Sequence, residues 1–161
     1  MRFEIYIKEP KKPDRFYTQA MDEYKKRLTG DCKLQYHFIR REKDWEKILS
    51  QAGDEKNLLI KIVPGKAEVT SELFADWIGE WERTGAKSLY FMIEPEREGE
   101  GSLTGSEETF ECLSGNSEFH AGEKYVLSLS CFAMPASMSA MILLEQIYRG
   151  YRIRNNQPYH K

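Results

Sequence analysis

The segment ILLEQIYRGYRIRNNQPYHK, residues 142–161, joins a helical pattern to an unusual ending. Together with the Met-rich residues before it, the segment predicts a helix that opens at Ser137 and runs through 138–153. The chain then ends on Pro-Tyr-His-Lys, residues 158–161, where a frayed polar tail is typical. A phenol, an imidazole and an ammonium group can stack, transfer protons and bind phosphate. The ending is therefore either a solvated tail or part of a functional site.

The rest of the chain alternates β-like runs with helical patterns. Strands are predicted at 2–8, 33–40, 57–63, 88–93 and 125–130, and further helices at 13–28, 44–52 and 72–85. This alternation indicates an α/β fold with a largely parallel, buried sheet flanked by helices. Residues 94–123 are poor in apolar side chains, and we interpret them as a long loop within one domain, 1–161.

Composition and residue spacing exclude several classes of protein. The 161 residues are 40% hydrophobic and 31% charged, which is typical of a globular chain. We expect a cytoplasmic protein, because no apolar run is long enough to span a membrane and the N-terminus resembles a strand more than a leader. The cysteines are odd in number and widely spaced, and the histidines share no ligand spacing. We therefore expect neither a disulfide framework nor a metal site.

Charge is unevenly distributed along the chain despite a net charge of −2. Residues 94–123 contain nine Glu and a single Arg, whereas the final helix and tail are basic. A basic end is compatible with a nucleic-acid surface, although a solvated charged face is the commoner explanation. Ligands of parallel α/β folds bind at the carboxyl ends of strands, which directs attention to VPGK (63–66), IEPEREGEG (93–101) and SCFAMP (130–135).

Several motifs resemble those of a known family. LSLSCFAMP (127–135) followed by residues 142–161 resembles the C-terminal part of the RlmH family, SPOUT-class methyltransferases that act on pseudouridine in large-subunit ribosomal RNA. DEYKKRLTGDCKL (22–34), PGKAEVTSELFADWI (64–78) and KSLYFMI (87–93) extend the resemblance over most of the chain.

The resemblance implies a SPOUT-type fold with a C-terminal trefoil knot, a homodimer, and S-adenosylmethionine bound among loops of the knot. The reaction would be methyl transfer to N3 of a pseudouridine in 23S ribosomal RNA, so the partners would be the RNA or the ribosome, with no membrane and no DNA. The residues placed at the cofactor by this resemblance are Lys61, Glu94, Leu129, Ser130, Cys131, Phe132, Ala133 and Met134.

The resemblance also gives the tail a role. His160 would assist removal of the N3 proton, because an imidazole of ordinary pKa can accept a proton at neutral pH. Tyr159 would stack on or orient the base, and Arg149, Arg154 and Lys161 would contact phosphates.

The chain departs from the family pattern at the cofactor side. Residues 93–95 are Ile-Glu-Pro where the family has Ile-Gly-Gly, and residues 61–62 are Lys-Ile where it has Leu-Asp. Ala136 and Ala140 stand where the family usually places His and Arg. A second hypothesis follows from these changes, in which the chain is a catalytically silent dimer that binds RNA or protein.

Overall fold

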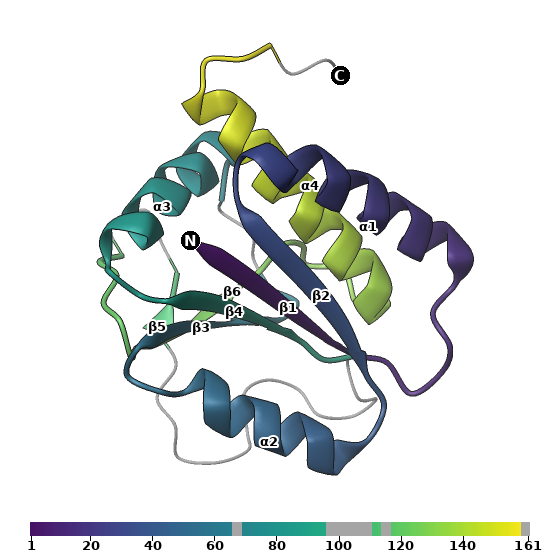
Figure 1. Ribbon diagram of the computed structural model, residues 1–161. Helices are drawn as coiled ribbons and strands as arrows, with labels where there is room; N and C mark the ends of the chain where they lie inside the picture. The colour runs from purple at the N-terminus through teal and green to yellow at the C-terminus, as the bar shows by residue number, and fades with distance from the viewer. Residues whose placement is uncertain (66–68, 96–110, 114–116, 159–161) are drawn as a thin grey trace.

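A six-stranded sheet forms the centre of the computed structural model, which describes residues 1–65, 69–95, 111–113 and 117–158 (Figure 1). Its strand order is β2-β1-β4-β3-β6-β5, and every neighbouring pair is parallel. The strands are β1 (Arg2–Lys8), β2 (Lys33–Ile39), β3 (Asn57–Ile62), β4 (Ser88–Ile93), β5 (Glu111–Cys112) and β6 (Lys124–Leu127).

Four helices connect the strands or follow them. They are α1 (Arg15–Arg27), which continues into the short 3-10 helix η1 (Leu28–Gly30), α2 (Glu42–Ala52), α3 (Ser71–Arg83) and α4 (Ala136–Arg154). The Asp14 side chain caps α1 by accepting a 2.8 Å hydrogen bond from the amide of Phe16, and Thr70 caps α3 by accepting one of 3.1 Å from that of Leu73. Such caps satisfy amides that have no partner within the helix.

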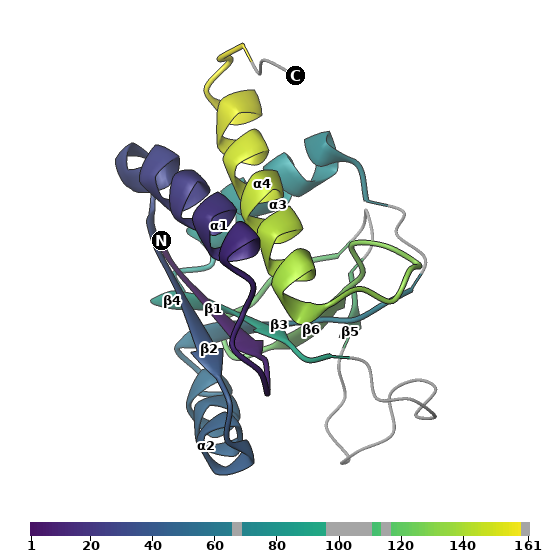
Figure 2. The same ribbon diagram turned by 90° about the vertical axis from the view of Figure 1, so that its right-hand side faces the viewer.

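The helices form two layers of unequal size around the sheet. Helices α1, α3 and α4 lie on one side of the sheet and α2 lies on the other (Figures 1 and 2). The larger core lies under the three helices, where Phe3, Ile5 and Ile7 of β1 are fully buried together with Trp77 and Trp81 of α3. This burial is the main stabilising contribution that fixes the position of the strand ends.

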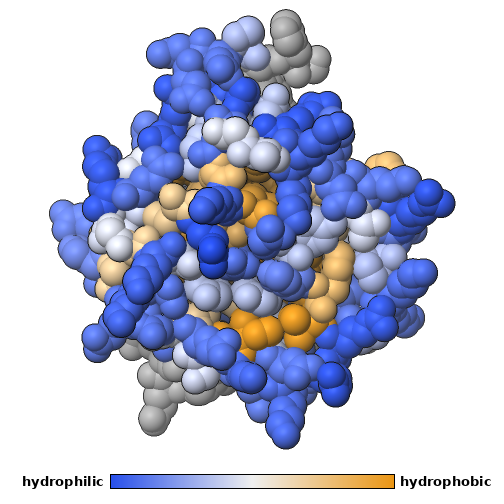
Figure 3. Space-filling model, in the orientation of Figure 1, coloured by the Kyte–Doolittle hydropathy of each residue, from blue (hydrophilic) through white to orange (hydrophobic). Residues whose placement is uncertain are grey.

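The opposite face of the sheet is only partly covered. Trp45 of α2 packs there against Leu59 and Met92 in a smaller buried cluster, while Tyr6 and Tyr90 stay partly exposed beside it. Figure 3, which has the orientation of Figure 1, shows a mostly hydrophilic surface with apolar side chains at its centre and near the position of α2.

Most of the elements predicted from the sequence are present, and the α/β class is confirmed. The predicted start of the last helix is wrong: α4 begins at Ala136, and Ser137 is a buried residue of its first turn whose hydroxyl donates a 2.5 Å hydrogen bond to Glu9. The expected loop 94–123 contains the two residues of β5. None of the described helices is both long and apolar enough to cross a membrane. The trefoil knot depends on chain segments outside the described residues and stays a prediction.

One glycine shapes the turn that leads into β6. Gly122 has φ +92°, donates a 2.6 Å hydrogen bond to the carbonyl of Asn57, and lies so close to Glu55 that a Cβ would be 3.2 Å from its Cα. Gly85 also has a positive φ, +75°, but a Cβ there would have no other atom within 4 Å. A Cβ at Gly30, whose φ is ordinary, would likewise meet no atom within 4 Å.

We expect Gly122→Ala to lower the free energy of unfolding by about 2 kcal/mol, because it combines left-handed strain with crowding against backbone. Gly85→Ala should cost about 1 kcal/mol from strain alone, and Gly30→Ala less than about 0.5 kcal/mol. Urea denaturation of the three variants checks this order. Equal losses for all three would show that the turn does not depend on Gly122.

Candidate functional site

Two loops are joined by hydrogen bonds at the carboxyl edge of the sheet, the edge where the parallel strands end. The amide of Val63 donates to the carbonyl of Leu127 at 3.0 Å, and the Ser128 hydroxyl donates to the carbonyl of Val63 at 2.9 Å. The amide of Gly65 donates to the carbonyl of Ser130 at 3.0 Å. A Cβ at Gly65 would lie only 2.5 Å from the Ser128 hydroxyl oxygen, so this approach requires glycine.

A small cavity, which we call the loop hollow, lies where these loops meet the end of β4. Its volume is about 20 Å³, and it is lined by Ile62, Val63, Pro64, Ile93, Glu94, Leu129, Ser130, Phe132, Met134 and Ser139. The three loops singled out from the sequence therefore converge on one place. Its walls combine apolar side chains with backbone, which suits a reaction that needs alignment of reactants and exclusion of water.

The hollow is lined by most of the residues that the family resemblance places at the cofactor. Glu94, Leu129, Ser130, Phe132 and Met134 line it, and the Phe132 side chain is 74% exposed. The neighbouring loop residues Cys131 and Ala133 are exposed and do not line it.

Lys61 belongs to this region through an ion pair rather than by lining the hollow. Its ammonium nitrogen lies 3.2 Å from a carboxylate oxygen of Glu94, whose other oxygen lies 2.9 Å from the nitrogen of Lys8. Burial of Glu94 opposes its ionisation, but the hydrogen bond from Lys8 and the charge of Lys61 prevail and hold its pKa below the ordinary value. Glu94 thus brings a negative charge, shared by two lysines, to a position where the family pattern has glycine.

Lys8 links the loop hollow to α2. Its nitrogen also lies 2.8 Å from a carboxylate oxygen of Glu42 in the first turn of α2, and 5.5 Å from the ring centre of Trp45. Desolvation acts to lower the pKa of Lys8, yet its two carboxylate partners raise it overall. Sequence reasoning missed both Lys8 and Glu42, because Lys8 is 34 residues from Glu42 and 86 from Glu94 and no local pattern signals such pairs.

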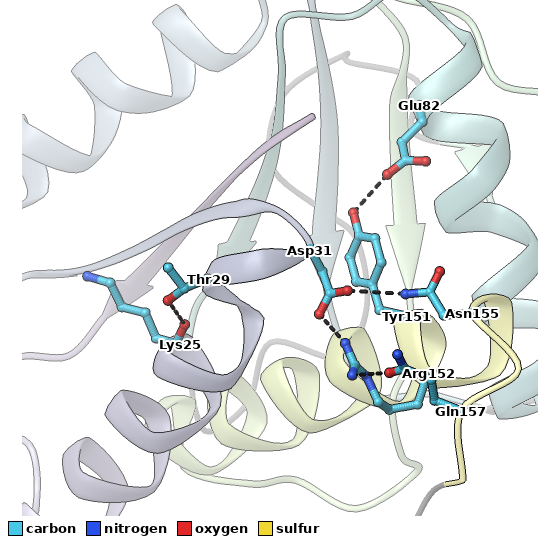
Figure 4. Close-up of polar contacts among 8 residues, drawn as sticks. All are labelled: Lys25, Thr29, Asp31, Glu82, Tyr151, Arg152, Asn155 and Gln157. Atoms are coloured by element: carbon cyan, nitrogen blue, oxygen red, sulfur yellow. Dashed lines mark hydrogen bonds and ion pairs between the residues drawn. The ribbon is translucent and has the colours of Figure 1, made fainter.

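The arginines of α4 are engaged within the protein. Arg149 lies 3.0 Å from Glu145 one turn earlier, and Arg154 lies 2.8 Å from Glu82 of α3. Glu82 also accepts a 2.8 Å hydrogen bond from the Tyr151 hydroxyl (Figure 4). A phosphate would have to compete with these carboxylates for Arg149 and Arg154, so their role in RNA binding stays a prediction.

A cluster of polar contacts that we call the Asp31 clamp secures the end of α4. Asp31 pairs with Arg152 through one carboxylate oxygen and accepts a 3.2 Å hydrogen bond from the Asn155 amide through the other (Figure 4). Arg152 also donates to the side-chain oxygen of Gln157. The backbone amide of Gln157 in turn donates to the backbone carbonyl of Arg152 at 2.9 Å. The clamp fixes where the tail leaves the protein. Tyr159, His160 and Lys161 lie outside the described residues.

The loop hollow and the Asp31 clamp lie at opposite ends of α4. Ser139, in the first turn, lines the hollow, whereas Arg152, in the last turn, belongs to the clamp. Thirteen residues separate them, which is about 20 Å along the helix axis. In Figure 1 the last described residues, 155–158, accordingly follow the end of α4 that lies farther from the loops.

Comparison with known proteins identifies the family. Residues 1–108 and 113–160 match the family described as "Predicted SPOUT methyltransferase". The chain is also 32% identical to the ribosomal RNA large subunit methyltransferase H of Clostridium botulinum (strain Okra / Type B1), over 92% of each chain. The chain is a member of this SPOUT methyltransferase family.

Other relatives show the same extent of similarity. The ribosomal RNA large subunit methyltransferase H of Clostridioides difficile (strain 630) is 32% identical over 92% of each chain, and the H 1 protein of Thermoanaerobacter sp. (strain X514) is 29% identical over the whole of both chains. Membership of the SPOUT methyltransferase family implies a methyl-donor cofactor. The match omits residues 109–112, which include both residues of β5.

The ion pairs of Glu94 give this SPOUT methyltransferase a testable pH dependence. Because the folded-state pKa of Glu94 is lowered from 4.5, its contribution to stability is present above that value and is lost as the pH falls through the folded-state pKa. We expect Glu94→Gln to be less stable than the wild type at pH 7, with the difference shrinking below about pH 4.5. Urea unfolding at several pH values measures it, and a difference that stayed constant down to about pH 3.5 would contradict the assignment.

Proposed function

We propose that the protein is an S-adenosylmethionine-dependent methyltransferase that modifies N3 of a pseudouridine in 23S ribosomal RNA, and that it acts as a cytoplasmic homodimer. The observation that carries the proposal is the convergence of the three strand-end loops on the loop hollow in a chain of the SPOUT methyltransferase family. The ribosomal substrate is supported by the names of the relatives. Relatives of similar length match along nearly the whole chain, which supports a common activity.

The residues of the loop hollow fit the chemistry of this cofactor. Leu129, Phe132 and Met134 offer an apolar surface to an adenine, and the loop backbone offers donors and acceptors whatever the side chains. Glu94 stays ionised, and its carboxylate suits a ligand that carries a sulfonium and an ammonium group. A volume of about 20 Å³ holds roughly one water molecule, so binding requires the walls to separate.

The position of the tail supports a dimer in which each tail serves the other protomer. Gln157 is held by Arg152, and His160 is only three residues further, a span of about 10 Å at full extension. The loop hollow of the same protomer begins about 20 Å back along α4. Three residues of extended chain are therefore too short to carry His160 back to its own hollow while the Asp31 clamp holds, which favours a second copy as the source of the site that the tail completes.

An apolar surface beside α4 suits such a dimer. Phe16 of α1 and Phe132 of the loop before α4 are 67% and 74% exposed, and the hydrogen bond from Ser137 to Glu9 joins the first turn of α4 to the segment before α1. Met138, Met141, Ile142 and Tyr148 are partly exposed residues of α4. Covering this surface by a second copy would remove large apolar groups from water.

Within this proposal the protein contributes alignment and proton transfer. The cofactor supplies an activated methyl group when bound. The Tyr159 ring orients the base, and His160 accepts the N3 proton, which requires the neutral imidazole at the pH of the reaction. Lys161 carries a positive charge toward the RNA backbone.

The residues that differ from the family pattern at the cofactor site favour a second candidate function. In it the chain is a catalytically silent dimer that binds RNA or protein. Glu94 and its two lysines occupy the place of a glycine loop, and Pro95 has no amide to donate. Loss of one or two hydrogen bonds to a buried ligand weakens binding by roughly tenfold to a hundredfold.

We expect S-adenosylmethionine to bind, more weakly than to relatives with the glycine loop. Calorimetric titration with the cofactor and with its demethylated product measures the affinity directly, and the C. difficile protein is a suitable reference. Binding should also raise the melting temperature, since a ligand stabilises the folded state that it binds. No heat and no thermal shift at millimolar ligand would favour the silent dimer.

A second test addresses the exchange of tails. His160→Ala and Gly65→Val should each inactivate the enzyme, the first by removing the proton acceptor and the second by driving a side chain into Ser128. In a mixed dimer the intact hollow of one protomer meets the intact tail of the other, so one of the two sites works. Because about half of the dimers in an equal mixture are mixed, about a quarter of wild-type activity should return.

Methylation of ribosomes by the mixture, compared with each variant alone, checks this exchange. Met134→Arg serves as the hollow variant if Gly65→Val does not fold. A mixture as inactive as its components would show that each tail serves its own protomer.

A further inference from the structure

A second depression, which we call the amino-edge groove, lies at the opposite edge of the sheet from the loop hollow. Its volume is about 830 Å³, and its walls come from the starts of four strands and from η1. Among its lining residues are Arg2 of β1, Lys33 of β2, Asn57 of β3, and Ser88 and Tyr90 of β4. Its volume is in the range of sites that hold a nucleotide-sized ligand.

The groove is positively charged. Arg2, Lys33 and Lys87 line it and are exposed, and among the described residues neither Lys33 nor Lys87 forms an ion pair. Within the described part of the chain, the ion-pair partner of Arg2 is Glu4, at a distance of 3.8 Å. The acid among the described lining residues, Asp31, is neutralised by Arg152 in the clamp. The three cations are therefore available to an external anion, unlike the arginines of α4.

Aromatic rings accompany these cations. Tyr90 lines the groove and is stacked on Tyr6, with ring centres 5.8 Å apart, and Tyr6 is stacked on His37 at 4.9 Å. Tyr6 and Tyr90 pack beside the α2 cluster and stay partly exposed, and His37 is exposed. Burial, followed by the charge of Glu4, raises the pKa of Tyr6 to about 12, so its ring stays neutral at physiological pH. A groove that combines cations with aromatic side chains is the pattern by which proteins bind single-stranded nucleic acid.

We propose that the amino-edge groove binds a single-stranded segment of RNA, with Lys33, Lys87 and Arg2 on its phosphates and Tyr90 against a base or ribose. This inference rests on the proposed function, because it assumes an RNA substrate. It adds a binding surface that is separate from the loop hollow and that no local motif of the sequence signals.

The location of the groove fits a role beside the reaction. Asp31 belongs both to the wall of the groove and to the clamp that holds the end of α4 (Figure 4). RNA in the groove would thus lie next to the point where the tail leaves the protein. If that tail completes the site of the second protomer, the groove of one protomer and the loop hollow of the other would hold neighbouring parts of the same RNA.

Charge reversal tests the proposal with a matched control. Lys33→Glu/Lys87→Glu changes two groove lysines, and Lys43→Glu/Lys47→Glu makes the same change at two exposed residues of α2. The probe is a fluorescently labelled, unstructured RNA of about 12 nucleotides, whose binding is followed by anisotropy between about 50 and 300 mM salt. Melting temperatures establish that each variant is folded, and calorimetric titration with S-adenosylmethionine tests the loop hollow separately.

We expect the groove variant to bind the RNA at least about tenfold more weakly than the wild type, with the control close to the wild type. The slope of log affinity against log salt should fall in magnitude by about 1.4, because each phosphate of a single strand that a lysine neutralises contributes roughly 0.7. Tyr90→Leu should weaken binding by about fivefold or more without changing that slope, because it removes stacking and no charge.

Two results would overturn the proposal: unchanged affinity of the groove variant, or equal weakening by both double variants. If ribosome methylation falls while the RNA affinity of the groove variant is unchanged, the groove binds a protein partner instead. The two proposals fail separately. Lysine-dependent RNA binding by a chain that binds no cofactor would support the groove and refute the methyltransferase, whereas methylation with no effect of the lysines would do the reverse.

Discussion

The parallel direction of every strand pair is the constraint on which the rest of the structure depends. It places all strand ends at one edge, so that loops distant in sequence meet there and bond to each other, as Val63 does to Leu127 and Gly65 to Ser130. The same arrangement places all strand starts at the other edge, where Arg2, Lys33 and Lys87 come together. An antiparallel sheet of the same sequence would distribute both groups over two edges.

Helix α4 extends from the loop hollow at one edge of the sheet to the Asp31 clamp beside the amino-edge groove at the other. Its first turn lines the loop hollow, and its last turn is secured to η1 and α3 through Asp31 and Glu82. Hydrogen bonds from Arg154 and Tyr151 hold the pKa of Glu82 below its ordinary value although burial opposes this, so the contact persists well below neutral pH. A rigid, well-paired helix end gives the tail a defined origin, and this favours exchange between protomers over folding back.

Local pattern was sufficient for most of the fold. Alternation predicted β1 and β4 with their observed bounds, and helical spacing predicted α3 to within two residues of each end. The same reasoning failed where a tertiary contact decides the outcome. The sequence pattern predicts that Ser137 opens α4, but Ser137 is buried in the first turn and its hydroxyl donates to Glu9 of a distant segment, and β5 is too short to leave a pattern in an acidic segment. The candidate site divides similarly: the loops could be located from strand ends, but the partners of Glu94 come from strands far along the chain.

The ion pairs of Glu94 have a consequence for how this chain can vary. A glycine there would remove the carboxylate that bridges Lys8 of β1 and Lys61 of β3, and would leave these two ammonium groups on either side of β4 without it. Substitutions at these three positions should therefore be strongly non-additive, as expected of residues that share one network. Substitution of Glu94 by glycine would then require earlier substitutions of Lys8 or Lys61. Epistasis at position 94 therefore separates this chain from relatives that have the glycine loop.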